Sequence, residues 1–303
     1  MGKLLASLGD FIQKFFCENF FDPIIYWALG STSDSKGMVD VVYSGLMGKS
    51  KEFLLMSPMS WASGSGWSFI NTVSSSFISV GAALVMIFWL IGICTDSLDI
   101  RSNFRLEVSL KQLAKLVVSE FLVTQSITIV SSLFGLVNAL CGNFNSSFSI
   151  KVSADLYKCV AEEKLGQNII LVLLSLVLLV MTVLAAGSIL YLSIVRIFKV
   201  LMIVPYSAIA TSTVASSHSV SSTTVSYWKY TLATILEAST MLLAVNLSGY
   251  LVSGNGTILD GVIKTSGSFQ NACGWIISTI IILAVTMGAV REAGQVTHRV
   301  IGA

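Results

Sequence analysis

Charged side chains are scarce in this sequence. Of its 303 residues only 11% are charged, whereas 54% are hydrophobic, and the mean hydropathy is +0.82. An average soluble domain carries about 25% charged residues, so this chain has too little polar surface to cover a water-soluble globule. The composition therefore predicts an integral membrane protein.

Other absences narrow the class of protein further. The formal net charge of +2 is too small to suggest a nucleic-acid-binding domain. No secretory signal peptide is visible, because Asp10 and Gln13 interrupt the first apolar stretch. Ala6 stands where the myristoylation pattern requires Ser or Thr. No Ser/His/Asp set and no catalytic pair of carboxylates stands out, so we expect neither an enzyme nor a bound cofactor.

Cysteine and histidine are too few and too dispersed for a metal site. The five cysteines include no Cys-x-x-Cys pair, and only His218 and His298 could complete a ligand set. Cys141 and Cys159 flank one loop of the predicted topology. A disulfide between them is one possibility, and buried free thiols are the other.

Long apolar runs dominate what remains. Five of them approach the roughly 20 residues that a helix needs to cross a bilayer. They are Trp67–Cys94, Leu113–Leu140, Asn168–Val195, Tyr227–Val252 and Trp275–Val290. A shorter run over residues 200–214 is broken by Pro205 and is predicted to form a half-helix or re-entrant element. The fold class is therefore an all-α polytopic membrane protein.

The first 66 residues are predicted to form a separate tail. Apolar side chains recur there with helical spacing. They are Leu4, Leu5, Leu8, Phe11, Ile12, Phe15 and Phe16. Polar residues interrupt this segment too often for a span, so we expect an amphipathic helix on the membrane surface. Residues 67–303 would then form the transmembrane domain.

Basic residues predict the orientation. With five spans the termini lie on opposite faces of the membrane, and the richer set of basic flanks marks the cytoplasm. This places the N-terminus outside and the C-terminus in the cytoplasm. The same arrangement defines a candidate cytoplasmic basic vestibule. It consists of Arg101, Arg105, Lys111, Lys115, Arg196, Lys199 and Lys229.

Two of the predicted spans carry a polar stripe that includes a glutamate. The stripe on the second span comprises Glu120, Thr124, Thr128, Ser131, Gly135 and Asn138. The stripe on the fourth span comprises Tyr230, Thr234, Glu237, Met241, Ala244 and Ser248. A carboxylate in hydrocarbon costs about 2.5–3.5 kcal/mol on insertion scales, so we expect both glutamates to face protein or water at similar depth. Lys115, Lys229 or the same glutamates of neighbouring subunits are the expected partners. The Ser and Thr positions are equally compatible with tight helix packing.

The order of these parts resembles a known family. After the third span come an Arg-containing helix end (Arg196), a Pro-plus-small-residue turn (Pro205), a polar run (Ser212–Thr224) and an aromatic/Lys helix entry (Trp228, Lys229). The segment from residue 68 to the end, closing in "EAGQVTHRVIGA", resembles the TrbL-like polytopic inner-membrane channel subunit of type IV secretion (conjugation) systems. The Gram-positive branch is closest. Members often carry an amide where this chain has Glu237.

The resemblance implies a non-enzymatic core subunit in a bacterial cytoplasmic membrane. It would assemble with itself as a ring, by analogy a pentamer, and form or line a path for single-stranded DNA with its relaxase or for secreted protein. Secretion ATPases, a coupling protein, membrane scaffold subunits and lipid would be its partners. Two alternatives stay open: a proton- or cation-coupled small-solute transporter that uses Glu120 and Glu237, and an assembly scaffold without a conduit. The absence of an internal repeat disfavours the transporter.

Overall fold

The computed structural model describes residues 11, 13–31, 35–98, 106–142, 149–150, 152, 154–161, 165–216, 218–253 and 267–302. Within these ranges the regular elements are helices, and no strand is found. The all-α prediction is therefore confirmed.

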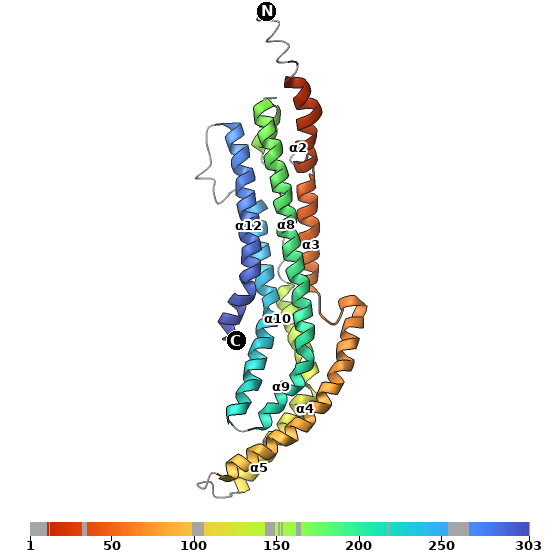
Figure 1. The fold of residues 1–303 in the computed structure, drawn as a ribbon, viewed down its shortest axis with the longest axis vertical. Coiled ribbons are helices and arrows are strands. Elements are labelled where there is room, and N and C mark those ends of the chain that lie inside the picture. The colour runs from red at the N-terminus through yellow and green to blue at the C-terminus, as the bar shows by residue number, and fades with distance from the viewer. Residues whose placement is uncertain are drawn as a thin grey trace, which may run out of the picture. The chain divides into compact units, whose positions relative to one another are not determined.

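Among the described residues, four helices are long and apolar enough to cross a membrane (Figure 1). They are α4 (Ser65–Leu98), α8 (Leu165–Ile203), α10 (His218–Ser253) and α12 (Ser268–Ile301). A bent pair, α5 (Leu106–Thr124) and α6 (Ser126–Cys141), gives a fifth candidate if it is counted as one span. By length and composition the chain is a multi-pass membrane protein, as predicted.

Shorter elements join and flank these helices. They are η1 (Cys17–Phe21), α2 (Asp22–Leu29), α3 (Met38–Leu55), η2 (Trp61–Gly64), α7 (Ala154–Ala161), η3 (Val204–Tyr206), α9 (Ser207–Ser212) and η4 (Thr213–Ala215). Pro23 lies in the first turn of α2, where the missing N–H costs no helical hydrogen bond.

The chain divides into two compact units, each built from three segments. Unit 1 comprises Met1–Phe53, Phe144–Leu192 and Met241–Glu292, and unit 2 comprises Leu54–Asn143, Ser193–Thr240 and Ala293–Ala303. The long helices α8, α10 and α12 contribute residues to both. This division cuts across the predicted boundary between residues 66 and 67.

In unit 1, helices α2 and α3 are held by buried polar contacts. Asp40 Oδ1 accepts a hydrogen bond of 2.8 Å from the Ile150 N–H. Asn168 Nδ2, at the start of α8, donates to Asp22 Oδ1 at 3.0 Å. Tyr43 packs fully buried in the same unit. Helices α2 and α3 therefore belong to a packed unit and do not form a separate tail.

The predicted amphipathic face at the N-terminus can be followed only in part. Phe11, Phe15 and Phe16 are exposed, as a membrane-surface helix requires. The remaining apolar residues of that face, Leu4, Leu5, Leu8 and Ile12, lie outside the described residues. Its position on a membrane surface stays a prediction.

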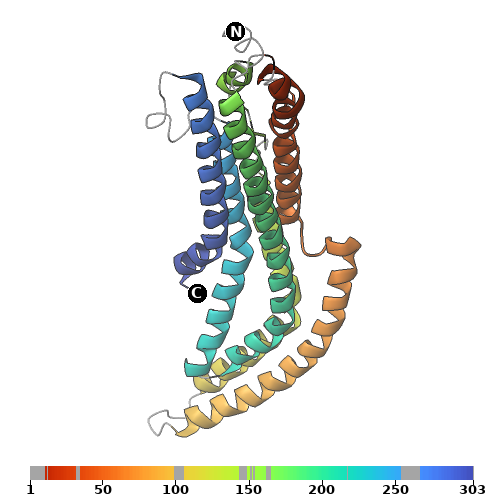
Figure 2. The ribbon, with the colours of Figure 1, turned by 45° about the horizontal axis from the view of Figure 1, so that its top comes forward.

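In unit 2, the short helix α9 packs against α4, α5 and α6 (Figures 1 and 2). Val85, Val123 and Ala208 form the centre of this core. Gly81 allows the closest approach, because a Cβ atom added there would lie 2.9 Å from the Ala208 carbonyl oxygen. A small residue is thus required where α4 meets α9.

Pro205 interrupts the backbone, as predicted from its sequence position. At η3 the Ser207 N–H bonds to the Val204 carbonyl, as a 3₁₀ turn requires, and not to the Ile203 carbonyl four residues before it. The Tyr227 hydroxyl donates to this carbonyl at 3.0 Å. A side chain of the protein therefore adds a hydrogen bond at this break, in keeping with the rule that irregular backbone within a membrane is covered by protein. Whether the segment is re-entrant stays a prediction.

The second predicted span is not one straight helix. It bends by 62° between α5 and α6. Gln125 leaves the helical region there, with φ −95° and ψ 5°. The prediction of a single polar stripe along a straight span is therefore wrong, because its members are divided between two helices of different direction.

None of the five cysteines, all of which the structure describes, forms a disulfide. Cys141 and Cys159 are both buried and form no disulfide. Buried thiols are therefore observed for this pair, which is the second of the two possibilities that the sequence left open. Cys94, in contrast, is exposed.

Candidate functional site

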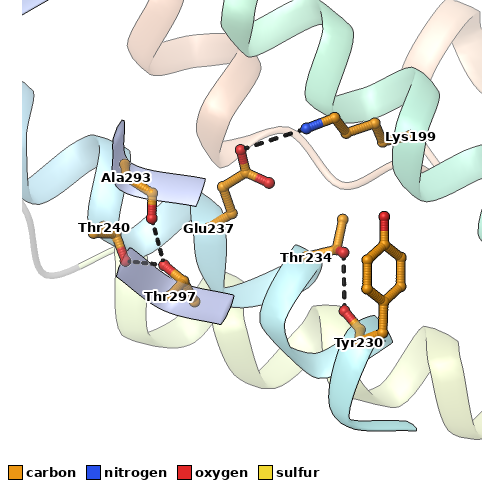
Figure 3. Close-up of polar contacts among 7 residues, drawn as sticks. All are labelled: Lys199, Tyr230, Thr234, Glu237, Thr240, Ala293 and Thr297. Atoms are coloured by element: carbon orange, nitrogen blue, oxygen red, sulfur yellow. Dashed lines mark hydrogen bonds and ion pairs between the residues drawn. The ribbon is translucent and has the colours of Figure 1, made fainter. Parts of the chain in front are cut away.

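Glu237 is buried inside unit 2. Its position on α10 leaves the side chain only 4% exposed. The nearest cation is on α8, where Lys199 Nζ lies 3.9 Å from Glu237 Oε1 (Figure 3). The prediction that this carboxylate faces protein is confirmed. The partner differs from the expected Lys115 or Lys229, both of which are outside this contact.

Arg196 adds a second cation to the same site. It precedes Lys199 by almost one helical turn on α8 and is as deeply buried as Glu237. Its guanidinium donates to the Ile235 carbonyl on α10 at 3.0 Å and interacts electrostatically with Glu237. Its assignment to an exposed basic vestibule is therefore wrong, because the side chain is covered by protein.

Helix α12 closes the third side of this site. A Cβ atom added at Gly294 would lie 2.7 Å from Glu237 Oε1, so the helix backbone runs directly beside the carboxylate. One turn further on, Thr297 and Thr240 share a hydrogen bond of 2.8 Å (Figure 3). The site thus joins α8, α10 and the last turns of α12.

The charges in this site are not fully balanced. Two cations face one carboxylate, and both Glu237 Oε2 and Arg196 Nε are buried without a hydrogen-bond partner. Buried charges of this kind are costly unless they are paired, so each depends on the others for its stability. No group of three metal-binding side chains occurs in the part of the chain that the structure describes. The arrangement can hold a charge inside the membrane domain and can fix three helices to one another.

Glu120 has a different environment. It lies exposed on α5, in a hollow of about 580 Å³ between α4 and α5. Ala82, Met86, Leu116, Val117, Phe121, Thr124 and Gln125 line the rest of this hollow, which we call the α4–α5 hollow. Within its own subunit Glu120 is therefore exposed, and its contact with water or with a neighbouring subunit stays a prediction.

The hydroxyl groups of both polar stripes bond mainly to their own helices. Thr124 Oγ1 donates to the Glu120 carbonyl and Ser131 Oγ to the Thr128 carbonyl, both at 2.8 Å. Thr234 and Ser248 bond in the same way to the carbonyls of Tyr230 and Val245. Because such bonds satisfy a hydroxyl without any partner helix, these residues give little evidence for a site.

The two stripes also differ in exposure. Thr234, Glu237 and Ser248 are buried by their own chain. Thr124 and Thr128 are exposed, and Ser131 and Asn138 are half-buried. The hydroxyl and carboxylate groups that stay open to another subunit therefore belong mainly to the α5–α6 stripe.

The other members of the predicted basic vestibule are dispersed. Lys111 and Lys229 are exposed, Lys115 is half-buried and Lys199 is 48% exposed. Arg101 and Arg105 lie outside the described residues. The vestibule stays a prediction for the lysines.

Glu120 and Glu237 do not form one site. The α4–α5 hollow is lined by Glu120 but not by Glu237, whose surroundings come from α8, α10 and α12. A proton or cation path that uses both carboxylates therefore has no support in the described part of unit 2.

Sequence reasoning missed the contribution of α12. Gly294 and Thr297 were not singled out, and His298, whose ring lies 4.9 Å from that of Tyr230, was considered only as a metal ligand. Their helical spacing on one face of "REAGQVTHRV" was the available signal. Comparisons with models of known families, with curated proteins and with solved structures gave no match.

Proposed function

We propose that this chain is a core membrane subunit of a type IV secretion machine. It would form or line a homo-oligomeric path for DNA–protein or protein substrates across the cytoplasmic membrane. The proposal comes from the order of the Arg196, Pro205, Ser212–Thr224 and Trp228–Lys229 elements in the sequence. It is supported by their occurrence within one packed unit.

The observation that carries the conduit hypothesis is the polar face that the single subunit leaves uncovered. Helices α5 and α6 expose Glu120, Thr124 and Thr128 although both belong to a candidate membrane span. A carboxylate is costly against acyl chains, so this face is expected to contact another subunit or a water-filled path. Both are features of a ring-shaped conduit.

The function is tested by deleting the gene in its host and measuring transfer. We expect loss of DNA or protein transfer, recovery with the wild-type gene, and co-purification of a secretion ATPase with the tagged chain. Unchanged transfer in the deletion strain would refute the proposal. A subunit that is required for assembly, but that never contacts substrate, would point to the scaffold alternative.

A further inference from the structure

Two helices of unit 2 that are candidate membrane spans each carry a charged side chain that forms no ion pair within the described part of the chain. Glu120 lies on α5 and Lys229 on α10, and both fall within candidate membrane spans. Both are exposed, and neither forms an ion pair with a described residue. The positions one turn away from Glu120, such as Leu116, Val117 and Thr124, offer no cation.

The surroundings of Glu120 limit what can cover it. The α4–α5 hollow presents mostly apolar walls around this one carboxylate. An acyl chain would suit the walls but would leave the charge without a partner, and water alone would suit the charge but not the walls. The matching occupant is an apolar surface that carries a cation.

This chain itself exposes such a surface. Lys229 is flanked on α10 by Val225, which is 56% exposed, and by Tyr230, which is 45% exposed. The lysine side chain has a long apolar stem, so it can reach into a hollow while its ammonium group meets a carboxylate. The two surfaces are complementary in both charge and polarity.

We infer that the α4–α5 hollow of one subunit receives the α10 face around Lys229 of the partner subunit. Glu120 then pairs with Lys229 of the partner subunit. Repeated head-to-tail, this contact closes a ring, as the proposed function requires. The ring closure rests on the proposed function, whereas the pairing rests on the two unpaired charges.

Charge reversal tests this pairing on the full chain in lipid nanodiscs. We expect E120K and K229E each to raise the concentration at which the oligomer dissociates by about tenfold or more, and the double variant to restore wild-type assembly. Oligomer mass is measured by mass photometry. Glu292→Lys and Arg291→Glu, at exposed positions on α12, are the matched controls and should assemble normally.

A cysteine pair gives a readout that does not depend on the stability of the charge variants. With the native cysteines replaced by serine, Glu120→Cys combined with Lys229→Cys should give a ladder of cross-linked subunits on oxidation, and neither substitution alone should. Assembly that is unaffected by folded E120K and K229E, or absence of the ladder, would overturn the inference.

The two proposals fail separately. Loss of transfer on gene deletion without a ladder would leave the proposed function and remove this interface. A ladder together with unchanged transfer in the deletion strain would leave the interface and remove the function.

Discussion

At the scale of single residues, Glu237 depends on charges carried by a neighbouring helix. Lys199 is almost half exposed, whereas Arg196 is buried with its Nε unsatisfied. Removing the carboxylate would therefore leave a buried guanidinium without a counter-charge, while Lys199 could still be hydrated. Most of the expected loss of stability is due to Arg196.

Glu237→Gln is accordingly expected to destabilise the protein by about 1–3 kcal/mol. This is less than the loss expected for a tight buried ion pair, because no direct bond joins the two groups. The free energy of unfolding is measured in detergent with Glu120→Gln as the exposed control, for which we expect little change. Equal stability of the wild type and Glu237→Gln would show that Glu237 does not stabilise the buried Arg196.

Gly294 offers a second test of the same site. A methyl group there would meet Glu237 Oε1 at 2.7 Å and force the carboxylate or α12 to move. We expect Gly294→Ala to lower the melting temperature, with a cost of about 1–3 kcal/mol.

The matched control is Gly288→Ala on the same helix, where no atom lies within 4 Å of the added Cβ. It should be neutral or stabilising by up to about 1 kcal/mol, because alanine favours the helix. A Gly294→Ala variant that behaves like Gly288→Ala would contradict the close contact between α12 and Glu237.

The sequence predicted that Glu237 is covered by protein but could not identify what covers it. The free-energy cost of a carboxylate inside a membrane predicts from the residue type alone that the Glu237 side chain is buried in protein. The partners come from α8 and α12, which lie 38 and 57 residues away at Lys199 and Gly294. Helical periodicity within one span contains no information about such pairings. For the same reason it could not show that Glu120 lies outside the core.

At the scale of elements, one of two helix breaks could be predicted from the sequence and the other could not. Pro205 removes a backbone donor, and its effect was predictable. The 62° bend at Gln125 contains neither proline nor glycine, which are the usual causes of a kink. It depends on how α5 and α6 pack in unit 2, so it appeared only in the structure.

Because α4 and α9 approach each other closely at Gly81, this position of the core should tolerate a larger side chain poorly. We expect Gly81→Leu to separate the two helices and to destabilise the protein by about 1–3 kcal/mol or more. Gly135→Leu on α6, where nothing lies within 4 Å of an added Cβ, is the control. Thermal unfolding that is equally affected in both variants would argue against the packing of α9 on α4.

Helix α8 is longer than a helix must be to cross the hydrocarbon core of a bilayer. Its 39 residues extend over about 58 Å, against a hydrocarbon core of about 30 Å. Exposed apolar side chains occur from Ile169 to Met202. Even a tilt of about 40° leaves about 45 Å along the membrane normal. Other protein is therefore expected to cover part of this surface, which agrees with an assembled subunit.

At the scale of the whole molecule, the predicted orientation can be tested directly. Lys111 should face the cytoplasm and Lys158 the outside, and both are exposed. With the native cysteines replaced, Lys158→Cys should react with a membrane-impermeant maleimide in intact cells. Lys111→Cys should react only in inverted vesicles. The reverse pattern would invert the topology and place the basic residues on the outer face.

The central claim is that substrate passes along an assembly of this chain. The most direct test is photo-cross-linking in cells during transfer, with the photoreactive residue at Lys111 or Lys115 and a control at Leu173, an exposed apolar position on α8. We predict adducts of transferred DNA or protein at the lysine positions and none at Leu173. Active transfer without adducts at either lysine would contradict a conduit role.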